Sequence, residues 1–88
     1  MDLKDYRKKI DEIDGEILRL FEARMALAGK ISAWKQANKQ SVFQPEREKQ
    51  KLESIKQQAD PKLLSYDRAL FETLFELSRS YQEERLRP

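Results

Sequence analysis

One stripe of side chains dominates the first third of the chain. Read from residue 3 in alternating steps of three and four, the sequence is apolar at every step but one. Such spacing places the positions on one face of a helix, and that face must be buried against another helix. We call this stripe the seam; its members are Leu3, Tyr6, Ile10, Ile13, Ile17, Leu20, Arg24, Leu27, Ile31 and Trp34. Because no acid lies in the seam, the anion that a buried arginine needs must come from another segment, another chain or a ligand.

Composition narrows the chemistry that the chain can perform. Its 88 residues include no cysteine and no histidine, which excludes disulfides, the usual zinc sites and catalysis by serine–histidine or cysteine–histidine pairs. We therefore expect any enzyme activity to rest on charge placement and shape, with no metal and no cofactor. Acidic and basic residues are interleaved around a net charge of +2, which is not the pattern of a nucleic-acid-binding surface.

The same composition indicates the fold class. Charged residues make up 39% of the chain, with two glycines and three prolines, as is typical of long solvated helices. No apolar run is long enough to span a membrane, and no secretory signal is visible. We expect one all-α domain over residues 1–88, located in the cytoplasm.

Three helices are predicted in the order long, short, long. Asp2 can cap the first helix, which ends before the break signals at residues 38–41. Pro45 suits the first position of a second helix. Asp60 and Pro61 repeat the cap-then-proline signal for a third helix that runs toward the C-terminus.

The first helix is too long to bury its seam within one chain. Roughly 35 residues span about 50 Å, whereas a compact chain of this size has a radius of gyration of about 12 Å. Pairing of two chains along this helix is the simplest remedy, so we expect a homodimer.

Two cations of the first helix could hold an anion between them. Lys35 lies within about 20° of Arg24 around the helix and about 16 Å along it, with Ala28 and Ile31 forming an apolar floor between them. A compact dianion fits such a site. The alternatives are that Arg24 only fixes the register of a coiled coil and that Lys35 is an ordinary solvated lysine.

Arg7 cannot share a site with Arg24 of the same helix, because it lies about 25 Å away and about 100° around the axis. An antiparallel partner helix could bring it there. Its alternative is a surface ion pair with Asp11.

The later helices add four polar candidates. Ser78 and Gln82 continue an apolar stripe of the third helix and share one face. They indicate either a ligand site or a helix end that is exposed to solvent. Arg47 and Glu48 open the second helix, where exposed charges often only complement the helix dipole.

Together, these seven residues resemble the ligand-binding set of the all-helical (AroQ-type) chorismate mutases, in their short monofunctional form. The resemblance covers nearly the whole chain, and its order and spacing are more specific than any single piece. The matching segments are residues 7–14 (RKKIDEID), 23–28 (ARMALA), 42–48 (VFQPERE) and 75–82 (FELSRSYQ).

The resemblance implies an intertwined homodimer of three-helix chains with two equivalent sites. Each site converts chorismate to prephenate, on the route to phenylalanine and tyrosine, and the arginine that matches Arg7 reaches in from the other chain. The reaction is a pericyclic rearrangement that needs no base, nucleophile or metal, which suits a chain without cysteine or histidine.

The resemblance also assigns roles to the seven residues. The two carboxylates of chorismate are bound by Arg24 and Arg7, with Ser78 and Arg47 in support. Lys35 and Gln82 donate hydrogen bonds to the ether oxygen. Glu48 accepts a hydrogen bond from the ring hydroxyl. Ala28 and Ile31 line the apolar wall of the site.

Other functions stay open at this point. Gln44 stands where family members can carry an acid, which puts more of the hydroxyl recognition on Glu48. An isochorismate-pyruvate lyase of the same fold is one alternative, although Glu48 favours the mutase. A non-catalytic helical dimerisation module is another. Docking to a second shikimate-pathway enzyme is a further expectation for so small a chain.

Overall fold

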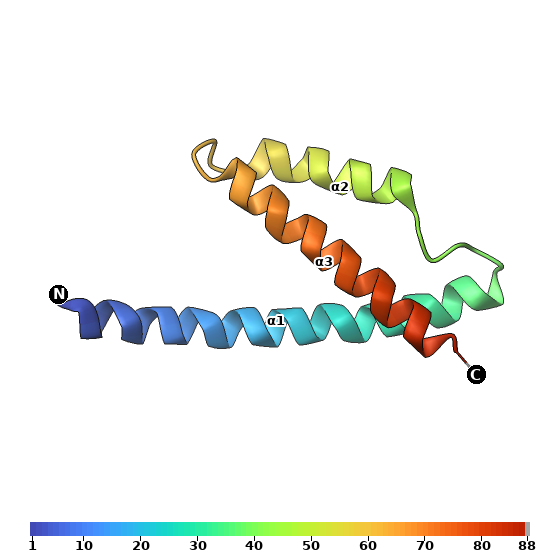
Figure 1. Cartoon of the computed structure of the whole chain (residues 1–88), viewed down its shortest axis with the longest axis horizontal. Helices are drawn as coiled ribbons and strands as arrows, with labels where there is room; N and C mark the ends of the chain where they lie inside the picture. Colours follow the sequence, from blue (N-terminus) through green and yellow to red (C-terminus); the bar gives the residue numbers. More distant parts are fainter. Residues whose placement is uncertain (88) are drawn as a thin grey trace.

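The computed structural model describes residues 1–87, and these are folded into three helices without a β-strand. The helices are α1 (Leu3–Ala37), α2 (Pro45–Gln58) and α3 (Leu64–Arg85). In Figure 1, α2 and α3 form an antiparallel hairpin, and α3 crosses the C-terminal half of α1. The predicted all-α class and the order long, short, long are confirmed. Pro88, the last residue of the predicted domain 1–88, lies outside the described residues.

Local hydrogen bonds fix both ends of α1. The Asp5 amide donates to the Asp2 carboxylate at 3.0 Å, and the Asp2 amide donates to the Asp5 carboxylate at 3.2 Å, which satisfies amides that the first turn leaves free. At the other end, the Asn38 side-chain amide donates to the Trp34 carbonyl at 2.8 Å. Lys39 then takes a positive φ of 55° and turns the chain away. The predicted cap and break are both confirmed.

The start of α2 is predicted correctly, but the start of α3 is not. Pro45 is the first residue of α2, where its missing amide hydrogen costs nothing. Asp60, however, does not cap α3. Its carboxylate accepts from the Lys62 amide at 2.9 Å, and its carbonyl accepts from the Leu63 amide at 2.9 Å. These bonds close a turn over residues 61–63, so the helix begins only at Leu64.

The seam of α1 stays uncovered within the chain, as predicted. Its nine apolar members are between 47% and 60% exposed, with Ile31 the least exposed and Leu3 and Trp34 the most. The N-terminal end of α1 extends past the α2–α3 hairpin (Figure 1), and the molecule measures 54 × 28 × 14 Å with a radius of gyration of 16.2 Å. A single chain of this shape leaves most of its longest apolar face in water.

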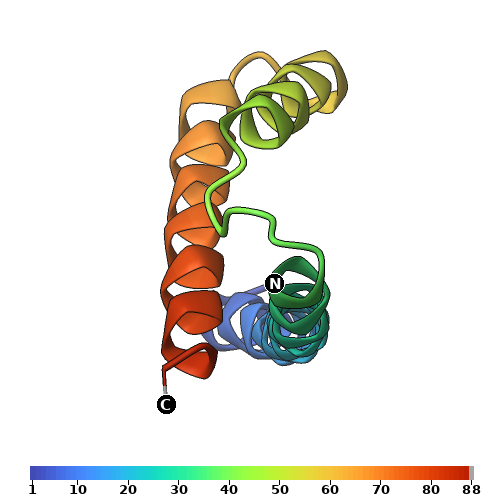
Figure 2. The same ribbon diagram turned by 90° about the vertical axis from the view of Figure 1, so that its right-hand side faces the viewer.

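A small core lies where α1 crosses α3. Ala28 and Ser32 of α1 and Phe75 and Gln82 of α3 are buried there. The Arg85 side chain covers Gly29, where a Cβ would lie 3.0 Å from it. Figure 2 shows α3 leading from α1 at one end to α2 at the other, and α1 and α2 each pack on α3.

No helix within residues 1–87 has the length and apolar character needed to span a membrane.

Candidate active site

A cavity of about 320 Å³ lies between α1, the α1–α2 loop, α2 and α3. Six of the seven predicted site residues line it, although they come from three different helices. Ala28 and Ile31, predicted as its apolar wall, line it too. The six are Arg24, Lys35, Arg47, Glu48, Ser78 and Gln82.

The charges that line the cavity are strongly unequal. Four cations face it, Lys51 in addition to the predicted Arg24, Lys35 and Arg47, against one carboxylate, that of Glu48. Like charges gathered around an empty space repel one another, so a bound anion would be stabilised there. The cavity therefore has the electrostatics of a site for a small, multiply charged anion.

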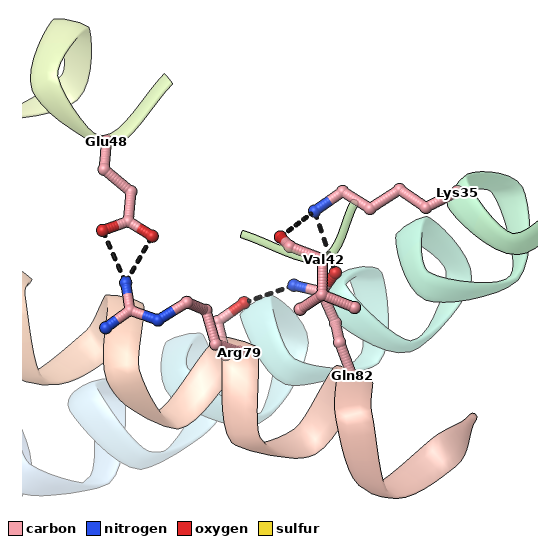
Figure 3. Close-up of polar contacts among 6 residues, drawn as sticks. Lys35, Val42, Glu48, Arg79 and Gln82 are labelled. Carbon is pink, nitrogen blue, oxygen red and sulfur yellow. Dashed lines mark hydrogen bonds and ion pairs between the residues drawn. The ribbon is translucent and has the colours of Figure 1, made fainter. Parts of the chain in front are cut away.

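Lys35 links the three parts of the chain that surround the cavity. Its ammonium donates to the Val42 carbonyl at 2.7 Å and to the Gln82 side-chain carbonyl at 3.0 Å (Figure 3). Burial lowers the pKa of Lys35 below its ordinary value of 10.5, and the negative charge of Glu48 opposes part of that change. An ammonium has three N–H donors, and these two bonds leave one for a ligand.

Gln82 carries the hydrogen-bond network on to Ser78. Its side chain is buried, and its amide nitrogen donates to the Ser78 hydroxyl at 3.0 Å. The second hydrogen of that amide nitrogen has no partner among the bonds of residues 1–87. Lys35 and Gln82 thus form two adjacent donors that are held in place before any ligand arrives.

Arg24 is half-buried and points its charge at the cavity. Its guanidinium lies 5.9 Å from the centre of the Phe75 ring, a cation–π contact that positions it without neutralising it. Within the described part of the chain it has no ion pair. The expectation that its anion comes from outside its own seam agrees with this arrangement.

Glu48 is held by a residue that the sequence did not point out. One guanidinium nitrogen of Arg79 donates to both carboxylate oxygens of Glu48, at 2.6 and 2.5 Å. The Arg79 guanidinium also lies 5.1 Å from the centre of the Phe43 ring. This pair connects α3, α2 and the loop before α2.

Comparison with known proteins agrees with this site. The family model of chorismate mutase type II matches residues 6–83. The chain belongs to the chorismate mutase type II family. It is also 44% identical over 54 residues to a bifunctional chorismate mutase/prephenate dehydratase from Aquifex aeolicus (strain VF5). That alignment covers 61% of this chain and 15% of the relative, so the chain matches only a small part of that longer protein.

Within this chorismate mutase fold, Arg7 is the predicted residue that the structure does not bring to the cavity. It is exposed on the N-terminal part of α1 and is absent from the cavity lining. Its alternative, an ion pair with Asp11, does not form among the described residues either. Arg7 of the same chain therefore does not contribute to this cavity.

Three polar contributors to the site were not found by sequence reasoning. Lys51 lies one turn after Arg47 on α2, and that spacing of four could have indicated it. Val42 acts through its backbone carbonyl, which leaves no trace in the sequence. Arg79 lies about 100° around α3 from Ser78, on a face that only the packing of α2 makes important.

Proposed function

We propose that this chain is a chorismate mutase that converts chorismate to prephenate in phenylalanine and tyrosine biosynthesis. The observation that carries the proposal is the cavity of about 320 Å³, lined by four cations and one carboxylate. Chorismate is a compact dicarboxylate with one ring hydroxyl, so its charges and its hydroxyl match this lining. Membership of the chorismate mutase type II family supports the same function.

The cations select the reactive shape of the substrate. Arg24 of α1 and Arg47 of α2 approach the cavity from different helices. Arg24 binds one carboxylate and Arg7 of a second chain binds the other, with Arg47 and Ser78 in support. Two carboxylates bound at separate points hold the flexible substrate folded, with the two carbons that must bond close together. Because this order is imposed before the reaction, part of the entropic barrier is removed. Ser78 adds a neutral hydrogen-bond donor on the α3 side.

Lys35 and Gln82 act on the bond that breaks. During the rearrangement one ether C–O bond breaks and one C–C bond forms within the same molecule, with no proton, water or leaving group exchanged. Negative charge grows on the ether oxygen as its bond lengthens. The remaining N–H donors of Lys35 and Gln82 stabilise that charge more in the transition state than in the ground state, which is the condition for faster turnover.

Glu48 and the apolar wall complete the site. The Glu48 carboxylate retains lone pairs beside its bonds to Arg79, and it accepts the ring hydroxyl of chorismate. Ala28 and Ile31 contact the apolar face of the ring and exclude water from it.

Pairing of two chains would complete each site. The exposed seam of α1 needs a partner, and a second copy offers the same apolar face in a two-fold arrangement. An antiparallel α1 from that copy could bring its Arg7 to the cavity around Arg24. We therefore propose an intertwined homodimer with two shared sites. Cytoplasmic location, a single domain over residues 1–88 and docking to another enzyme of the pathway stay predictions.

An assay with two substrates tests this function. The purified chain should consume chorismate and form prephenate, while isochorismate should be turned over much more slowly, because its hydroxyl lies elsewhere on the ring and does not reach Glu48. Chromatography identifies the products. Faster release of pyruvate from isochorismate would identify a lyase instead, and no acceleration of either reaction would leave the chain without this activity.

A further inference from the structure

Glu48 is the one carboxylate lining the cavity within residues 1–87. It is paired with Arg79 and not with the cations that face the cavity. Figure 3 shows its carboxylate directed to Arg79, while Lys35 is directed to Val42 and Gln82. The side chains of Glu48 and Arg79 are 23% and 29% exposed. An ion pair at this depth is screened less than a fully exposed pair, so it contributes more to holding Glu48.

Arg79 is itself anchored from a second side. Its guanidinium lies over the Phe43 ring at 5.1 Å, and it does not line the cavity. Arg79 therefore holds Glu48 from behind the cavity wall. A single residue of α3 thereby contacts both the first turn of α2, which carries Glu48, and the loop before it, which carries Phe43.

Without Arg79, Glu48 would have other partners. Arg24 and Lys35 on α1 and Arg47 and Lys51 on α2 line the same cavity. The charge of Glu48 already acts on Lys35, since it raises the pKa of that residue against the larger effect of burial. A carboxylate released near these cations would pair with one of them and neutralise a group that a dianionic ligand needs.

We propose that Arg79 is a positioning residue that fixes the Glu48 carboxylate as the acceptor for the substrate's ring hydroxyl and keeps it from pairing with the cations of the cavity. The inference rests on the proposed mutase function and adds a residue that does not touch the substrate. Arg79 acts through Glu48, so its effect disappears when Glu48 carries no charge.

A double-mutant cycle tests this dependence. Arg79→Met removes the charge but keeps an apolar contact with Phe43, and it should lower kcat/KM about tenfold, mainly through KM, as expected for the loss of one charge-assisted contact. Arg79→Lys should restore most of that loss. Glu48→Gln combined with Arg79→Met should be no slower than Glu48→Gln alone.

Arg68→Met is the matched control. Arg68 lies on the same helix and pairs with Glu72 at 2.8 Å on the surface, so its removal deletes an ion pair of α3 away from the cavity. Its kcat/KM should match that of the wild type. Thermal unfolding of each variant separates folding defects from positioning defects.

Three results would overturn the inference while the mutase function stands. They are wild-type kinetics in Arg79→Met, a double variant slower than Glu48→Gln by the full Arg79→Met factor, and an Arg79→Lys chain as impaired as Arg79→Met. If Arg79→Met does not fold, Arg79→Gln takes its place in the same cycle, and its results are interpreted in the same way. An inactive wild-type chain would instead refute the proposed function itself.

Discussion

The Lys35 ammonium lies 3.0 Å from the side-chain carbonyl of Gln82, joining α1 to α3 between positions 47 residues apart. This bond orients the Gln82 amide, because an oxygen that accepts from Lys35 turns the amide nitrogen toward Ser78. The two proposed donors are therefore aligned by each other rather than by the substrate. Donors that are fixed before the reaction need no reorganisation when charge develops, which is the most effective form of electrostatic stabilisation.

Lys35→Ala should lower kcat by about 10² to 10³, the usual loss when one transition-state donor is removed. KM should change less, because the substrate carboxylates keep their arginines. Steady-state kinetics measure both values, and circular dichroism checks the helices. A folded variant with most of the wild-type turnover would remove Lys35 from the mechanism.

Gln82→Glu should make the activity depend on pH, with the highest turnover at low pH. A carboxyl group can donate to the ether oxygen only when it is protonated, so turnover should be substantial at low pH and poor at neutral pH. Lys35, 3.0 Å from the side-chain oxygen that glutamine and glutamate share, favours the ionised form and moves the active range to lower pH. The test is a pH profile of kcat, with Gln82→Asn as a neutral control. An unchanged profile would contradict the donor role.

The pH profile of kcat/KM should report the ammonium of Lys35. Burial lowers the pKa of Lys35, so its charge, and the activity with it, should be lost as pH rises through a value below 10.5. Glu48→Gln removes the negative charge that raises this pKa, so the alkaline loss should begin at lower pH than in the wild type. An alkaline loss at the same pH as in the wild type would show that Glu48 does not act on Lys35.

Complementation tests whether Arg7 serves the site of the partner chain. Arg7→Ala and Arg24→Ala should each impair both sites of a homodimer. A mixed dimer has one intact site and one site that lacks both arginines. Random exchange of equal amounts makes about half of the dimers mixed, so about one quarter of all sites should recover.

That exchange must be completed by co-expression or by unfolding and refolding the mixture. Verified mixed dimers without any gain over the separate variants would mean that Arg7 acts within its own chain or not at all, and the shared site would be wrong.

Local signals explain what the sequence predicted well. Asp2 and Pro45 each influence only the residues next to them, so the starts of α1 and α2 could be predicted from the sequence. The end of α1 could be predicted in the same way from the break signals that follow it. The exposed seam could also be predicted, because it depends only on helix length. Arg24 and Lys35 were found together because one helix fixes their spacing.

Competing local bonds and packing explain what was missed. Asp60 has the same cap-then-proline signal as a helix start, but its carboxylate closes a turn instead. The role of Arg79 depends on the packing of α2 on α3, which brings Glu48, 31 positions away in the sequence, into contact with it. The Gln82 orientation likewise depends on an amine from another helix. No periodicity within a single helix contains these relationships.

The rate of prephenate formation by the purified chain, compared with that of its Arg24→Ala variant, tests the central claim most directly. The cavity described here predicts turnover far above the spontaneous rearrangement for the wild type, and a loss of at least about a hundredfold in kcat/KM when Arg24 no longer binds a substrate carboxylate. Both proteins should show the same helical content. A wild-type chain no faster than the spontaneous reaction, or a folded Arg24→Ala chain as active as the wild type, would contradict the assignment of this cavity as a chorismate mutase site.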